Sequence, residues 1–173
     1  FAGWGGTSVK TVPNPMIDDV NGSDFVMEFI KGGESWAGSY SDPIGGAFDF
    51  VVSKEFTMKV YSDTAGPVLF KLEDPANAGN NVELAVDYTT PGQWAELTFD
   101  LSAPDQQLGD PTIPMGKIVL IPDKGDAGTG GHIWYFDDIY GPPFIPGDDV
   151  EVTFEVTDLD DNFSTVEFDV SGD

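Results

Sequence analysis

The chain has 173 residues and a net charge of −24, with 31 Asp and Glu against 7 basic residues, all of them Lys. That charge repels phosphate backbones and anionic membranes, so we expect no nucleic-acid partner, and no apolar run is long enough for membrane insertion. The chain contains no Cys, which excludes disulfides, thiolate chemistry and cysteine-ligated zinc.

Alternating apolar and polar residues recur along the chain, which is the pattern of half-buried β-strands. The alternation is clearest over 55–62, where Phe56, Met58 and Val60 are separated by other residue types. The predicted strands, in chain order, are 24–30, 47–52, 55–62, 68–73, 82–88, 94–101, 117–121 and 132–140. The connecting segments are turn-like, and no segment shows a helical period with caps. The sequence predicts an all-β fold, a two-sheet antiparallel β-sandwich of the jelly-roll type.

Three prolines in GPPFIPGDD indicate a boundary, because proline ends a strand and stiffens a connection. We divide the chain into a core (1–141), a Pro-rich linker (142–147) and a tail (148–173). The tail reads as a C-terminal extension of two strands, the second of which ends in VEFDV.

Several ordered stretches are similar to the carbohydrate-binding-module β-sandwiches found in secreted glycan-binding proteins and glycoside hydrolases of Bacteroidetes. The matching stretches are FAGWGG (1–6), NGSDFVMEFIKGGESWAG (21–38), FTMKVYSDTAGPVLFKLED (56–74), GQWAELTFDLS (92–102) and WYFDDIYGP (134–142). The resemblance covers nearly all of 1–142. It implies a jelly-roll module, extracellular or on the cell surface in its mature form, that binds a β-glycan without catalysis.

The chain departs from that family in the position of one strand. In the family an acidic strand precedes the turn that resembles FAGWGG, and here VEFDVSGD at the C-terminus has that pattern. The resemblance thus implies that the first strand is displaced to the C-terminus. The tail then pairs with its own core, completes a neighbouring copy, or begins a following module.

We favour donation to a neighbouring copy, because the Pro-rich linker is expected to hold the tail away from its own core. Residues 164–170 would donate the strand, with Val166, Phe168 and Val170 on its buried side. Head-to-tail contacts of this kind build an open filament, so a non-enzymatic structural array is our first functional hypothesis. A non-catalytic β-glycan-binding module is the second.

Five residues are candidates for a glycan surface, because sugars stack on aromatic rings and polar side chains bind their hydroxyls. They are Trp36, Lys59, Tyr61, Lys71 and Glu73, and we place the last four on two adjacent strands. The alternatives are that Trp36 packs in a core and that the others form a solvated face.

A structural calcium ion is expected at Asp138, by resemblance to the jelly-roll modules, with Glu167 and Asp169 of the completing strand as partners. Alternation places Asp137 and Asp138 on opposite faces of their strand. The alternative is a pair of solvated carboxylates. No catalytic residue is predicted, because His132 is the only histidine and close acid pairs are unavoidable among 31 acids.

Overall fold

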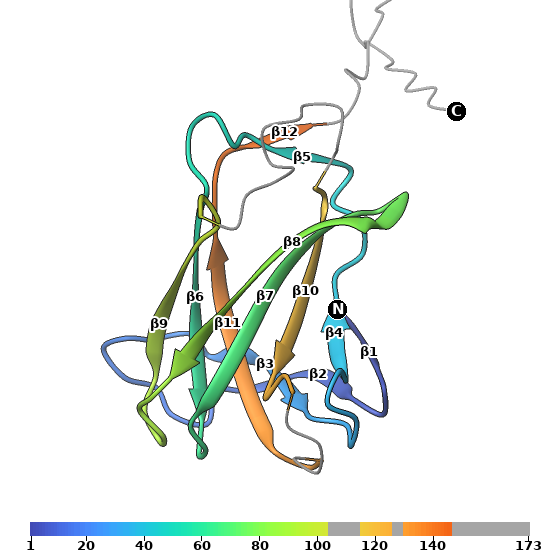
Figure 1. The fold of residues 1–173 in the computed structure, drawn as a ribbon. Helices are drawn as coiled ribbons and strands as arrows, with labels where there is room; N and C mark the ends of the chain where they lie inside the picture. The colour runs from blue at the N-terminus through green and yellow to red at the C-terminus, as the bar shows by residue number, and fades with distance from the viewer. Residues whose placement is uncertain (104–114, 126–129, 147–173) are drawn as a thin grey trace, which may run out of the picture.

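The computed structural model describes residues 1–103, 115–125 and 130–146, which form two antiparallel sheets packed face to face (Figure 1). The predicted β-sandwich is confirmed. Sheet A contains, in spatial order, β1 (Ala2–Trp4), β4 (Gly38–Tyr40), β10 (Lys117–Pro122), β7 (Gly66–Asp74) and β8 (Asn77–Tyr88). Sheet B contains β2 (Ser8–Pro13), β3 (Phe25–Ile30), β11 (Ile133–Tyr140), β6 (Glu55–Ser62) and β9 (Ala95–Asp100).

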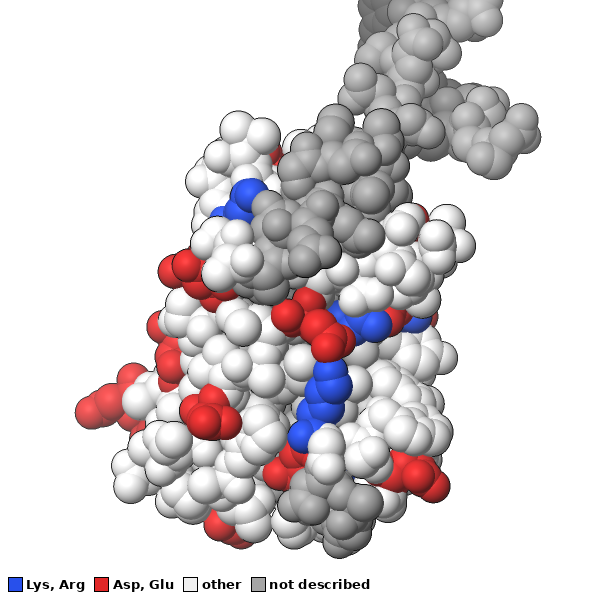
Figure 2. All heavy atoms as spheres, in the orientation of Figure 1, with Lys and Arg blue, Asp and Glu red and all other residues white. Residues whose placement is uncertain are grey.

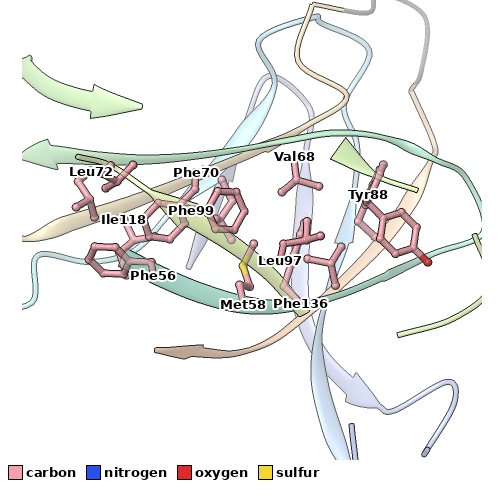
Figure 3. Close-up of a cluster of buried hydrophobic side chains, with 14 of the residues drawn as sticks. Phe56, Met58, Val68, Phe70, Leu72, Tyr88, Leu97, Phe99, Ile118 and Phe136 are labelled. Atoms are coloured by element: carbon pink, nitrogen blue, oxygen red, sulfur yellow. The ribbon is translucent and has the colours of Figure 1, made fainter. Parts of the chain in front are cut away.

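Alternation sets which side of each strand faces the core. Alternate residues in the middle of β6 and β7 are at most 1% exposed and belong to the core between the sheets; these are Phe56, Met58, Val60, Val68, Phe70 and Leu72. Figure 3 shows all of them except Val60 with labels. Burying one such side chain contributes about 1.5–3 kcal/mol, so a one-residue slip of β6, which would bring Lys59 inside, is strongly disfavoured. Lys59 and Tyr61 therefore point out of sheet B, and Lys71 and Glu73 point out of sheet A.

The turn at FAGWGG carries the chain from the edge of sheet A to the edge of sheet B. Gly5 and Gly6 have φ values of 65° and 83°, a region that side chains rarely tolerate. A Cβ on Gly5 would also lie 2.8 Å from the Cβ of Ala37. This close approach brings β1 against β4 beside the turn.

A third, two-stranded sheet pairs β12 (Phe144–Pro146) with β5 (Gly46–Phe48). β12 occupies part of the segment predicted as linker, and the amide of Asp49 also donates to the carbonyl of Pro143, at 2.8 Å. The chain is thus tied to the sandwich as far as Pro146. The predicted tail, 148–173, lies outside the described residues. Within the ranges that the structure describes, no helix has the length and hydropathy to span a membrane.

Candidate functional site

The five candidate glycan residues fall at three separate places. Although β6 and β7 are consecutive, β6 belongs to sheet B and β7 to sheet A, so the placement of the four polar candidates on adjacent strands is wrong. The short turn between them resembles a hairpin in sequence, but it crosses from one sheet to the other. Trp36 lies in the β3–β4 connection, 53% exposed, with its ring against the turn at Gly5.

The outer face of sheet A holds Lys71 and Glu73 in a cluster of ion pairs. Lys71 Nζ lies 2.8 Å from Glu73 Oε1, and Lys117 Nζ lies 3.2 Å from Glu73 Oε2. The Lys117 ammonium also lies 4.5 Å from the centre of the Tyr40 ring. Figure 2, viewed from this side, shows lysines and acids gathered in the middle of the face. These charges bind one another.

Electrostatics favour a charged Glu73. Burial alone would raise the pKa of its carboxyl, but the hydrogen bonds and positive charges of Lys71 and Lys117 outweigh burial. The pKa of Glu73 therefore lies below its ordinary value. Beside this cluster, Trp4 and Tyr40 pack on three buried apolar side chains, Leu69, Val119 and Ile121.

The outer face of sheet B carries an aromatic cluster made of Tyr61, Trp94 and Tyr135. The ring of Tyr61 lies 5.6 Å from that of Trp94 and 5.8 Å from that of Tyr135, measured between centroids. Strand register continues this row outward, since Tyr135 pairs with Glu28 of β3 and Glu28 with Lys10 of β2. One line of aromatic and charged side chains thus crosses the sheet.

The β2–β3 loop, residues 14–24, covers part of this cluster. The Trp94 Nε1–H donates to the carbonyl of Met16 at 2.7 Å, and Asn14 Oδ1 lies 3.2 Å from the same nitrogen. Trp94 is 4% exposed and Tyr61 is 9% exposed, whereas Tyr135 is only half-buried. Tyr135 is therefore the ring of the cluster that a ligand can reach most directly.

Both tyrosines of the cluster remain hydroxyl donors at neutral pH. Burial raises the pKa of Tyr61, and the nearby carboxylate of Asp63 raises it further. Burial likewise raises the pKa of Tyr135, with Glu28 adding to the effect, and the Tyr135 hydroxyl lies 3.4 Å from Glu28 Oε2.

Lys59 lies next to the aromatic cluster on the same face. Its Nζ lies 2.6 Å from Asp138 Oδ2, and its Cα pairs in register with those of Asp137 and Glu96. The hydrogen bond to Asp138 raises the pKa of Lys59, so this side chain stays cationic. The carboxylates of Asp137 and Asp138, which can accept hydrogen bonds, and the ammonium of Lys59, which can donate them, thus lie next to the aromatic cluster.

A β-bulge explains why Asp138 reaches Lys59. The register of β11 shifts between Asp137 and Tyr140, and Asp138 has a φ of 46°. The expectation that Asp137 and Asp138 lie on opposite faces is wrong, because Asp137 pairs with Lys59 and Asp138 binds the same lysine. The extra residue resets the alternation, so that Ile139 again packs against the core.

A groove opens in sheet B beside this bulge. β11 pairs with β3 only over Ile133–Phe136, whereas its pairing with β6 continues as far as Tyr140. Counting only described residues, the β3-facing edge of Asp137–Tyr140 has no strand partner. The groove has a volume of about 490 Å³, and its lining includes Phe1, Phe25, Met27, Phe136 and Ile139.

The calcium prediction is not tested by these residues. In the described ranges, no three acidic or histidine side chains come close enough to hold a metal ion, and Asp138 is already neutralised by Lys59. Asp137 Oδ2 is buried and has no hydrogen-bond partner in the described part of the chain. The other expected ligands, Glu167 and Asp169, lie outside the described residues, as do the strand-donation residues Val166, Phe168 and Val170.

Two polar features are not indicated by the sequence. Lys31 is buried, with its ammonium donating to the carbonyls of Ala37 at 2.7 Å and Glu34 at 3.0 Å, and burial lowers its pKa. Asp123 is also buried, and its Oδ2 accepts from Trp134 Nε1 at 3.1 Å and lies 3.0 Å from His132 Nδ1. Both support loops at one end of the sandwich. Trp134, in contrast, is fully buried, as the alternation of apolar residues along β11 requires.

Solved structures with a similar fold are carbohydrate-binding modules. The family 11 carbohydrate-binding module of Clostridium thermocellum, solved in complex with a β-1,3-1,4-mixed-linked tetrasaccharide, matches with a TM-score of 0.52 and 14% identity. That match covers 82% of this chain and 85% of the other. This chain has the fold of carbohydrate-binding modules.

A second match supports the same fold. The CBM22-2 xylan-binding domain of a Paenibacillus barcinonensis protein matches with a TM-score of 0.50 and 11% identity, over 80% of this chain and 88% of that one. No protein-family model matches the chain, and a search of curated proteins gives no match. The solved structures therefore establish the fold, and the site must be argued from this chain's own residues.

Proposed function

We propose that this protein is a non-catalytic, extracellular β-glycan-binding module, and that the glycan lies on the outer face of sheet B. The observation that carries the proposal is the pair of neighbouring rows that hold Tyr135 and Lys59, where a half-exposed ring adjoins hydrogen-bonding charges. Glycan recognition needs both, because sugar C–H faces stack on rings while hydroxyls require donors and acceptors. The fold shared with carbohydrate-binding modules agrees with this assignment.

Sheet A is the weaker candidate for the site. Lys71, Lys117 and Glu73 are paired with one another, as Lys59 is with Asp138 on sheet B, so the two faces differ in the contacts of their aromatic rings rather than in ion pairing. The ring of Tyr40 is already contacted by Lys117. Lys59 and Tyr61 of the predicted glycan set thus belong to the proposed site, and Lys71 and Glu73 do not.

Isothermal titration with soluble mixed-linkage β-glucan, laminarin and xylan tests the function. We expect one of the β-glycans to bind with saturable heat and an α-glucan such as glycogen to give none. No heat with any β-glycan, at protein concentrations that detect millimolar affinity, would contradict the proposal. The titration also separates mixed-linkage from uniformly linked glycans as the ligand.

The structural array predicted from the sequence is the second candidate function. The open edge of β11 favours it, because an unpaired strand edge can accept a strand from a neighbouring copy. We rank the array lower because the tail of the same chain can fill this edge, as proposed below, and an edge that is already filled cannot accept a strand from another copy. Light scattering across a concentration series tests it, and growth beyond the monomer mass is the result it requires.

A further inference from the structure

We propose that the groove beside β11 is an acceptor site for a β-strand, and that its occupant is residues 164–170 of the same chain. This site adjoins the glycan face, with which it shares Asp137 and Asp138, and its test uses no glycan. The proposal combines three observations: an unpaired strand edge, an apolar lining, and a matching strand pattern at a reachable position in the chain.

The first observation is the edge itself. Main-chain amides and carbonyls of Asp137–Tyr140 have a strand partner on the β6 side and, in the described ranges, none on the β3 side. Backbone polar groups in a sandwich are almost always paired, and an open edge pairs readily with an added strand. β3 stays bound to β2 as far as Phe25, so β3 does not move across to close the gap.

The second observation is the lining. Met27, Phe136 and Ile139 pack against the main core, so the groove opens onto the interior of the sandwich. At its rim Phe25 is 61% exposed and Phe1 is 46% exposed. Exposed aromatic side chains next to an open edge indicate a surface that is covered in the complete protein.

The third observation is the pattern of the tail. Val166, Phe168 and Val170 alternate with polar residues, which gives a strand one apolar side for the groove. Glu167 and Asp169 then fall on the solvent side, near Asp137. Lys10 and Lys59 lie on that side of the sheet, each already paired with one carboxylate, Glu28 and Asp138 respectively.

The chain can deliver this segment to its own groove. Because β12 ties the chain down as far as Pro146, residues 147–163 form the connection, and they reach up to roughly 55 Å when extended. A short tether holds the tail at an effective concentration of about a millimolar, well above the usual concentration of a second copy. The same chain therefore fills the groove before a neighbour does.

Disulfide trapping in the full-length chain tests the proposal directly, because the protein has no cysteine of its own. Ile139→Cys is combined in turn with Val166→Cys, Phe168→Cys and Val170→Cys, since neighbouring strands bring Cα atoms within disulfide range. The control pairs the same tail cysteines with Thr98→Cys, an exposed position on β9 at the far edge of sheet B. Oxidation at micromolar protein is followed on non-reducing gels.

We expect at least one Ile139 pair to form an intrachain disulfide ten times faster than its Thr98 control. Equal rates would overturn the acceptor site, and predominantly dimeric products would overturn the choice of the chain's own tail. Hydrogen exchange gives a test without new cysteines. The amides of Ile139 and Tyr140 should exchange at least tenfold faster in Phe168→Asp than in wild type or the matched Glu167→Gln. Equal exchange in both variants would contradict occupancy.

Discussion

Charged side chains form ion pairs on the outer faces of both sheets, and on sheet B these pairs adjoin a cluster of three aromatic rings half covered by a loop. On sheet A, Glu73 holds two lysines and one of them covers Tyr40. On sheet B, the carboxylate of Asp137 keeps an unpartnered oxygen in the described region, and Tyr135 is half-exposed. The comparison teaches that residue types alone do not mark a binding face, because the contacts that each aromatic ring already makes decide whether a ligand can reach it.

The largest difference in stability between the two faces should come from substitution of Trp94 on sheet B and Trp4 on sheet A. Trp94→Ala should lower the free energy of unfolding by about 3–5 kcal/mol, because a buried ring and the anchor of the 14–24 loop are both lost. Trp4→Ala on sheet A should cost clearly less, because Trp4 is only partly buried. Urea unfolding of both variants measures the difference. Equal losses would show that the loop does not depend on Trp94.

Acid should weaken the ion cluster on sheet A. The folded pKa of Glu73 lies below its ordinary value, so its contribution is present above the unfolded pKa and is lost as pH falls through the folded pKa. Glu73→Gln should therefore cost on the order of 1 kcal/mol at pH 7 and much less at pH 3. Urea unfolding at both pH values checks this, with Glu55→Gln, an exposed position on β6, as the control. A cost that does not change with pH would contradict the pairing.

Alkali should weaken the ion pair on sheet B. The folded pKa of Lys59 lies above its ordinary value, so the contribution of this lysine is complete below the unfolded pKa and is lost as pH rises through the folded pKa. The stability difference between wild type and Lys59→Met should therefore shrink above about pH 10.5. A difference that persists at pH 12 would show that the stem of Lys59, rather than its charge, stabilises the face.

The smallest effect concerns calcium. If the tail brings Glu167 and Asp169 to Asp138, added calcium should raise the melting temperature and EDTA should lower it by a few degrees. Asp138→Asn should remove that response. An identical melting temperature in calcium and in EDTA would show that no structural calcium ion binds at Asp138. Asp138 would then act only as the ion-pair partner of Lys59.

The sequence predicts the strands well but not their partners. The predicted strand 55–62 is β6, and 132–140 differs from β11 by one residue, because two-residue alternation is a local property. Membership of a sheet is not local. The turn between Ser62 and Gly66 reads as a hairpin, yet it joins opposite sheets, and this separates Lys59 from Lys71.

Two parts of the candidate site, the bulge at Asp138 and the strand Ser8–Pro13, could not be predicted from the sequence. The bulge at Asp138 breaks the alternation that placed Asp137 and Asp138 on opposite faces. Asp tolerates a positive φ better than most side chains, but this chain has too many Asp residues for residue type to single out position 138. The strand Ser8–Pro13 is mostly exposed because it lies at the edge of sheet B, and its hydrophobic pattern is weak. Lys10, at the rim of the groove, was missed with it.

The central claim is that sheet B, not sheet A, binds glycan, and a paired titration tests it most directly. Isothermal titration with the tightest-binding β-glucan should show at least a tenfold weaker affinity for Tyr135→Ala, a loss of about 1.4 kcal/mol, while Tyr40→Ala binds as wild type. Matched thermal melts confirm that both variants are folded. Unchanged affinity in Tyr135→Ala, together with a loss in Tyr40→Ala, would contradict the account and move the site to sheet A.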